Sequence, residues 1–210
     1  MTEVDLYNLS PTLRLLGMCV LIALLPLVWT LYHNRHQPVN FKLRAITVLT
    51  LFLTFDLVLF GSFTRLTDSG LGCPDWPGCY GSASPIGAVA HIDAAQTAMP
   101  TGPVTHNKAW IEMIHRYFAM VVGFLILVLA LSSTWQRWKG QFSFNGAWQV
   151  KPFWAWFTLF WVCMQGAFGA LTVTLKLSPA IVTLHLLGGI GLLVLLSAQV
   201  AWKPESQRQA

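Results

Sequence analysis

Charge is scarce in this sequence: Asp, Glu, Lys and Arg make up only 10% of its 210 residues, whereas 55% are hydrophobic. Ordinary soluble domains carry about 25% charged residues. So little charge cannot cover a globule of this size with a water-facing surface, which excludes an ordinary soluble protein. Part of the surface must therefore face membrane lipid.

Five apolar stretches are long enough to cross the hydrocarbon core of a bilayer, which takes about 20 helical residues. They are residues 15–32, 45–63, 109–131, 153–175 and 180–202. The first is too long for a cleaved signal peptide, and no small-residue cleavage site follows it. We therefore predict an all-α polytopic membrane protein. A four-helix bundle occupies 45–202, and an additional N-terminal transmembrane helix with a basic loop occupies 1–44.

The net charge is +5, and eight of the 13 Lys and Arg residues gather in three segments. These segments are 33–44, 135–151 and the tail at 203–210. A strict alternation of five spans puts all three on one side, and connections rich in Lys and Arg stay in the cytoplasm. We predict a protein of a bacterial-type inner membrane, with the N-terminus and the 64–108 loop outside and the C-terminus inside. The same distribution argues against nucleic acid as a partner.

Cysteine is rare as well, with four residues in the chain. Cys19 and Cys163 lie inside spans and are interpreted as packing residues. Cys73 and Cys79 lie in the outer loop, where the prolines and the glycine between them bend the chain tightly. Outside the cytoplasm oxidation is permitted, so a disulfide is the first expectation. A redox-active dithiol, or a metal pair completed by a loop histidine, stays open, although this spacing is not a zinc signature.

Only two of the six histidines, His115 and His185, fall within predicted spans, where an ionisable side chain is costly and points to function. At 1.5 Å per residue, they lie about 9 Å and about 7.5 Å below the outer ends of their spans. The two spans run in the same direction, so the imidazoles can meet at one level. Such a pair suits axial coordination of haem iron inside a helix bundle. The others are expected to be solvated: His33, His36, His91 and His106.

Two glycines, Gly188 and Gly189, follow His185 by about one turn. They either leave room for a flat macrocycle or allow close helix packing. Asp56 and Gln165 are polar residues at membrane depth, expected to form hydrogen bonds between helices or to take part in proton movement.

Glu112 precedes His115 by three residues and shares a helical face with it. Its carboxylate could act as a general acid or base, or hold a substrate group. The alternative is a salt bridge with Arg116 one turn later. Arg65, where the second span leaves the bilayer, either snorkels to lipid head groups or pairs with an anionic group such as a haem propionate. The Gly, Pro, Ala and Ser content of 82–102 predicts irregular structure over the membrane surface.

Four motifs in fixed order resemble the haem A synthases, the cytochrome oxidase assembly enzymes that convert haem O to haem A. They are GSFTRLTDSGLGCPDWPGC at 61–79, EMIHR at 112–116, QGAFGALTV at 165–173 and PAIVTLHL at 179–186. The resemblance extends over about 43–202. It implies that His115 and His185 are the axial ligands of a haem, either the haem O substrate or haem B. It also implies that Glu112 is the essential carboxylate near the reacting porphyrin methyl, and that Cys73 and Cys79 are the outer-loop cysteine pair.

Family members carry two similar four-helix halves with a histidine pair in each, whereas the Glu-x-x-His element is not repeated in this sequence. The resemblance therefore covers the N-terminal half of the family fold. It implies partners: the enzyme that makes haem O, an unidentified electron acceptor, and either a second copy of the chain or a separately encoded second half. Three functions stay open, namely a haem A synthase-type oxidoreductase or its N-terminal half, a bis-histidine b-type cytochrome that carries electrons, and an inactive haem-binding half-protein or assembly factor.

Overall fold

The computed structural model describes residues 9–140 and 151–202 of the chain. The predicted cytoplasmic tail at 203–210 lies outside the described residues, as does 141–150 in the middle of a predicted basic connection.

Five helices of the described chain are long and apolar enough to cross a membrane. They are α1 (Ser10–His33), α2 (Val39–Leu66), α4 (His106–Trp138), α5 (Pro152–Thr174) and α6 (Pro179–Ala201). Each predicted span lies inside one of these helices or overruns its end by a single residue. The prediction of an all-α polytopic membrane bundle is therefore confirmed.

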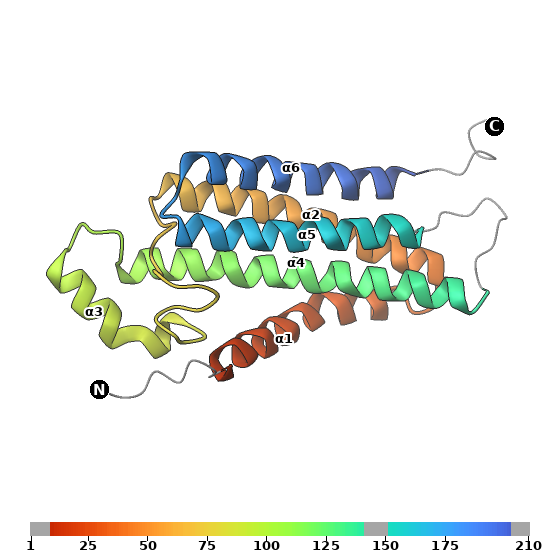
Figure 1. Cartoon of the computed structure of the whole chain (residues 1–210). Helices are drawn as coiled ribbons and strands as arrows, with labels where there is room; N and C mark the ends of the chain where they lie inside the picture. The colour runs from red at the N-terminus through yellow and green to blue at the C-terminus, as the bar shows by residue number, and fades with distance from the viewer. Residues whose placement is uncertain (1–8, 141–150, 203–210) are drawn as a thin grey trace.

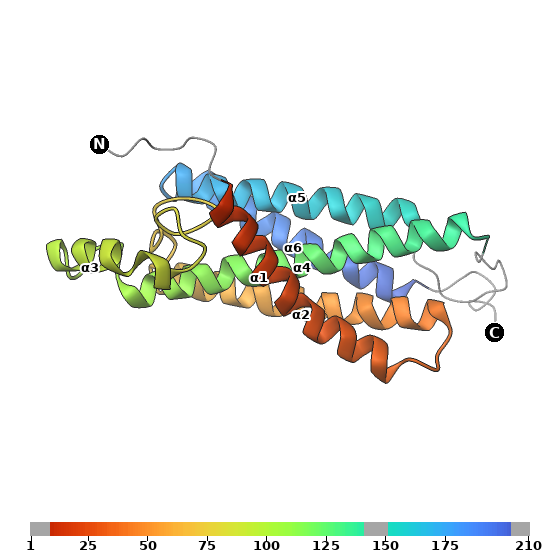
Figure 2. The ribbon, with the colours of Figure 1, turned by 90° about the horizontal axis from the view of Figure 1, so that it is seen from below.

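Four of these helices form a ring (Figure 1). Helix α2 contacts α4 and α6, and α5 contacts the same two helices, whereas α4 and α6 make no direct backbone approach. Helices α4 and α6 thus occupy opposite corners of the ring and face each other across its centre. The additional helix α1 lies outside the ring, packed on α4 and α2, and crosses them obliquely in the view of Figure 2.

The sequence explains where these helices begin and how they tolerate polar residues in the interior. Helices α5 and α6 start at Pro152 and Pro179, a position where a missing N–H costs no hydrogen bond. Three buried threonines of α2 donate hydrogen bonds of 2.7–2.9 Å to backbone carbonyls one turn earlier (Thr47, Thr50 and Thr54). This local bonding satisfies each hydroxyl without a partner helix.

The outer loop between α2 and α4 is more regular than the sequence predicts. It contains a 3-10 turn, η1 (Pro85–Ala88), and a helix, α3 (Val89–Ala98). The expectation of irregular structure across 82–102 is therefore wrong for this part. Ala-rich sequence favours a helix, and Ile92 anchors α3 because its side chain is completely buried in the cluster beneath the loop.

Candidate functional site

His115 projects from α4 toward α2. A Cβ atom added to Gly61 would lie 2.9 Å from Cε1 of His115, so the ring packs directly on the backbone of α2. The ring of Phe60 stacks on the imidazole with 6.4 Å between centroids and 12° between planes. The glycine and the phenylalanine together fix where this imidazole lies.

His185 is held in a similar way by the opposite helix pair. It projects from α6 toward α5, where a Cβ atom added to Gly169 would lie 3.5 Å from its Cε1. The Nδ1 atoms of His115 and His185 are both buried, and neither has a hydrogen-bond partner among the described residues. Buried polar atoms are nearly always satisfied, so an unpartnered nitrogen on each ring is unusual.

The two histidines lie at the same level of the bundle. One core cluster joins Val122 and Ile126 of α4 to Leu192 and Leu196 of α6. Val122 lies seven residues beyond His115, and Leu192 lies seven residues beyond His185. Both rings therefore stand two turns, about 10 Å, outward of the same packed layer.

These residues fit a haem. The two imidazoles project from opposite corners of the helix ring, and each has a nitrogen without a hydrogen-bond partner among the described residues. Bis-histidine coordination of a haem needs such a pair of donors. A three-ligand metal site is a poorer match, because no cluster of three or more His, Cys, Asp or Glu residues occurs in the described part of the chain. The assignment of His115 and His185 as ligands stays a prediction.

Gly188 and Gly189 serve helix packing rather than open space. The amide of Gln165 fills the position that a Cβ atom on Gly188 would take. The indole nitrogen of Trp161 donates to the carbonyl of Gly188 at 2.8 Å. A Cβ atom on Gly189 would meet Val58 at 3.5 Å. Of the two interpretations of these glycines, the structure favours helix packing, with Gly188 against α5 and Gly189 against α2.

Glu112 and Arg116 form a buried ion pair that faces the outer loop. The other carboxylate oxygen of Glu112 accepts the backbone N–H of Cys73 at 2.7 Å. Arg116 also donates to the carbonyls of Asp75 at 2.7 Å and Cys73 at 3.2 Å, and to that of Gly78. The salt-bridge alternative for Glu112 is thus present, and the pair also ties the loop to α4 one turn from His115.

The loop itself is closed by a disulfide between Cys73 and Cys79, both of them fully buried. The carboxylate of Asp75 accepts the backbone N–H groups of Tyr80 and Gly81 at 2.6 and 2.7 Å, which tightens the turn further. With both sulfurs joined, neither is free to act as a thiolate ligand for metal. The prediction of a disulfide agrees with the structure.

The remaining candidate residues lie on α2 or in and beside the outer loop. Arg65 is exposed in the last turn of α2, so both of its expected roles stay open. In the outer loop His91 stacks on Tyr80 at 5.3 Å, and Nε2 of His106 lies 2.6 Å from Asp93. Asp56 is exposed on α2, not bonded between helices of this chain as the sequence suggested.

Sequence reasoning missed that Gly61 and Gly169 pack against the rings of His115 and His185. Both glycines stand in the motifs quoted above, but nothing in a single sequence pairs a glycine on one helix with a histidine on another. The sequence feature that could have pointed to these glycines is their depth in the membrane, because each lies near the outer end of a predicted span, as the histidines do.

The fold and the site define a class: polytopic membrane bundles with an inward-facing histidine pair on diagonal helices. Residues 44–210 match the family model of the cytochrome oxidase assembly proteins. The chain is 40% identical to haem A synthase of Shewanella oneidensis over 148 residues, which is 70% of this chain and 42% of that protein. It is 30% identical to haem A synthase of Exiguobacterium sibiricum over 146 residues, or 68% of this chain and 41% of that protein.

The chain therefore belongs to the haem A synthase family of cytochrome oxidase assembly proteins. A third relative, haem A synthase of Lysinibacillus sphaericus, is 26% identical over 144 residues, covering 69% of this chain and 39% of that protein. The chain spans about two fifths of the length of these relatives. No solved structure matches it significantly. Helix α1 lies before the region that the family model matches.

Proposed function

We propose that this chain holds a haem between His115 and His185 and takes part in haem A synthesis, oxidising a methyl group of haem O to a formyl group. The observation that carries the proposal is the pair of partly buried imidazoles at one level, each with a buried Nδ1 atom that has no partner among the described residues. Family membership supports the choice of haem over any other ligand.

In this proposal the protein positions the two imidazoles and keeps water away from the haem site. Gly61 and Phe60 orient the imidazole of His115, and Gly169 gives that of His185 its room. The buried aliphatic layer formed by Val122 and Leu192 with their neighbours closes the site from the inner side. Bound haem would supply the redox chemistry of the reaction.

Glu112 is the proposed carboxylate for moving a proton at the reacting methyl. It lies on the turn before His115, but its oxygens already accept hydrogen bonds from Cys73 and Arg116. A role in proton transfer therefore requires Glu112 to exchange one of these partners. Arg65 and Arg116 are the proposed contacts for acidic groups of the haem.

The engagement of Glu112 favours a second candidate function. If the carboxylate only anchors the loop, the same histidine pair describes a b-type cytochrome that carries electrons and needs no acid or base nearby. The two functions differ in one product, haem A.

Cellular context completes the proposal. We place the chain in a bacterial-type inner membrane with its N-terminus outside, a haem-binding bundle at 45–202 and a cytoplasmic tail at 203–210. Its haem O would come from the enzyme that makes it. A second copy of the chain or a separate second half would complete the assembly, and the electron acceptor is not identified by any residue described here.

Co-expression with a source of haem O, followed by extraction of pigments, tests this function. The chain should yield haem A, and Glu112→Gln should retain bound haem but lose haem A, because the amide keeps an acceptor for the Cys73 amide but cannot take up a proton. Bound haem without haem A in the unaltered protein would support the electron carrier instead.

A further inference from the structure

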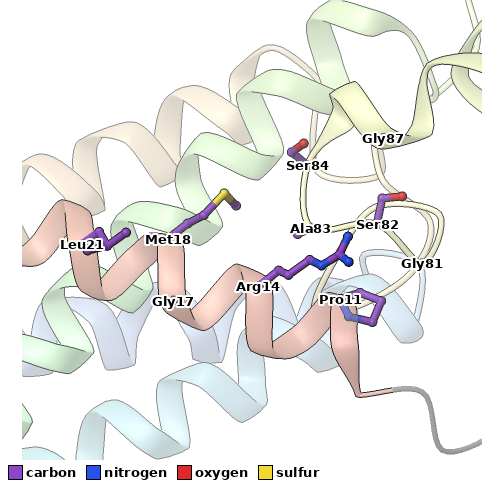
Figure 3. Close-up of a pocket in the computed structure, with 10 residues that line it drawn as sticks. All are labelled: Pro11, Arg14, Gly17, Met18, Leu21, Gly81, Ser82, Ala83, Ser84 and Gly87. Atoms are coloured by element: carbon purple, nitrogen blue, oxygen red, sulfur yellow. The ribbon is translucent and has the colours of Figure 1, made fainter.

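A groove with a volume of about 560 Å³ runs between the first three turns of α1 and the outer loop at 81–87 (Figure 3). It lies on the side of α1 that faces away from the bundle core. The lining residues used below are Arg14, Gly17, Met18 and Leu21 of α1 and Ser82 and Ser84 of the loop.

Helix α1 presents two different sides. One side carries the buried residues Leu15, Cys19, Ala23 and Leu27, which pack on the bundle. The other side carries Arg14, Met18 and Leu21, which follow one another at the spacing of a single helical face. Leu21 lies seven residues, about 10 Å, deeper along the helix than Arg14. The groove thus has a cationic outer end and an apolar inner end.

Among the residues that the structure describes, none compensates the positive charge of Arg14 there. Figure 3 shows its guanidinium directed toward Ser82 of the loop, and no described acidic side chain lines the groove. Two other cations at this end of the molecule have carboxylate partners: Lys108 pairs with Asp68 at 3.1 Å, and Arg116 pairs with Glu112. No hydrogen bond or ion pair joins Arg14 to another residue that the structure describes.

Space is available next to this cation. A Cβ atom added to Gly17 would meet nothing within 4 Å, although the glycine lies in the middle of the groove face of α1. In a membrane-spanning helix such a gap is filled by lipid or by another ligand. A ligand for this groove needs an anionic group beside Arg14 and an apolar tail along Met18 and Leu21.

We propose that the groove binds an anionic phospholipid from the leaflet on the side of the outer loop. Its phosphate pairs with Arg14 and accepts hydrogen bonds from the serine hydroxyls of the loop, since a guanidinium fork matches phosphate oxygens. One acyl chain follows Met18 and Leu21 toward the bilayer centre. The site requires neither haem nor the proposed chemistry, and one of its walls is the helix that the family model does not cover.

Photocrosslinking in vesicles locates such a lipid. The full chain is reconstituted in phosphatidylcholine with a small fraction of phosphatidylglycerol that carries a diazirine on an acyl chain, and adducts are mapped by mass spectrometry. We expect adducts on the 14–21 segment, with fewer from phosphatidylcholine bearing the same label. One cation near an anionic lipid contributes enough to change its binding about fivefold, so Arg14→Gln should lower these adducts by about that factor.

Two variants and an internal control make the result specific. Gly17→Leu should also remove the adducts, because its side chain begins in open space, extends into the groove and leaves Arg14 in place. Lys176→Gln, at an exposed position of the outer surface away from the groove, should change nothing. Adducts near Lys42 and Arg44, at the other end of the bundle, should persist in every variant and report correct folding.

Three results would overturn the proposal. They are equal labelling of the groove by both lipids, adducts that survive both Arg14→Gln and Gly17→Leu, and full protection of the groove by soluble glycerol phosphate. The last result would mean that the groove binds a free anion and not a lipid.

Discussion

At the residue scale, two glycines determine how the histidines are placed. A methyl group on Gly61 would come within 2.9 Å of the His115 ring, which is too close for an ordinary contact. The corresponding distance at Gly169 is 3.5 Å, which is normal van der Waals separation. The His115 side of the site is therefore the tighter of the two, and α2 cannot approach α4 at this level with any larger residue.

Gly61→Ala should displace the imidazole of His115 and reduce haem bound per purified chain, with a change in the low-spin spectrum. Gly123→Ala is the matched control, because Gly123 lies in α4 and a Cβ atom there would meet nothing within 4 Å. The control should keep the haem content of the unaltered chain. Equal haem content and equal spectra in both variants would contradict the tight packing of His115 on α2.

The sequence singles out groups whose chemistry is unusual in a membrane, but it says little about what these groups contact. His115 and His185 stand out because ionisable side chains are rare at this depth. The loop carbonyls that Arg116 contacts are 38 to 43 residues away in sequence, so only the local pair with Glu112 could be anticipated. From the sequence, Glu112 could act in proton transfer or substrate binding, or form a salt bridge with Arg116. In the structure its carboxylate is bonded to Arg116 and to the backbone of Cys73.

At the element scale, the outer loop is attached to α4 through a buried charge pair. Glu112 and Arg116 are both more than nine-tenths buried, and they hold the segment that the disulfide closes. The span boundaries were predictable because long apolar runs define them. Helix α3 was not, because glycine and proline around it obscured a short Ala-rich helix whose stability depends on burying Ile92.

Arg116→Met should loosen the loop, because it leaves the carboxylate of Glu112 buried and unpaired. Breaking a buried pair costs about 3–5 kcal/mol, so amide hydrogen exchange across 73–82 should rise by at least about tenfold. Hydrogen–deuterium exchange of the detergent-solubilised chain measures this directly.

The control for that experiment is Lys108→Gln, which removes an ion pair whose Asp68 side chain is 74% exposed. An exposed pair contributes about 1 kcal/mol or less, so exchange in 73–82 should stay near that of the unaltered chain. If amide exchange across 73–82 is as slow in Arg116→Met as in Lys108→Gln, the buried ion pair does not anchor the loop.

At the scale of the whole molecule, one end of the bundle carries the described residues of the basic segments. Figure 1 shows the α1–α2 turn and the C-terminal end of α4 at the end opposite the outer loop. Arg35, Lys42, Arg137 and Lys139 belong to that end, and none of them has an ion pair with a described carboxylate. Such an asymmetry is what cytoplasmic retention of positive connections requires.

The orientation can be measured with single cysteines. In a chain whose own cysteines are replaced by alanine, Thr101→Cys in the outer loop should react with a membrane-impermeant maleimide on intact cells. Gln37→Cys in the α1–α2 turn should react only after the cells are opened. The reverse pattern would invert the proposed topology.

The arrangement of whole helices was less accessible to sequence than their number. Apolar runs and charged connections predict five spans and their order of crossing. They do not say that α4 and α6 lie diagonally, or that α1 packs outside the ring, because these choices depend on side-chain packing between distant segments. The equal depth of the histidines could be predicted only because both helices cross the membrane in the same direction.

The central claim is that one haem binds between His115 and His185, and difference spectroscopy tests it most directly. Reduced-minus-oxidised spectra of the purified chain should show a low-spin bis-histidine haem. His115→Ala and His185→Ala should each abolish it, whereas His91→Ala, in the outer loop, should not. A normal low-spin spectrum in both span variants would contradict the account.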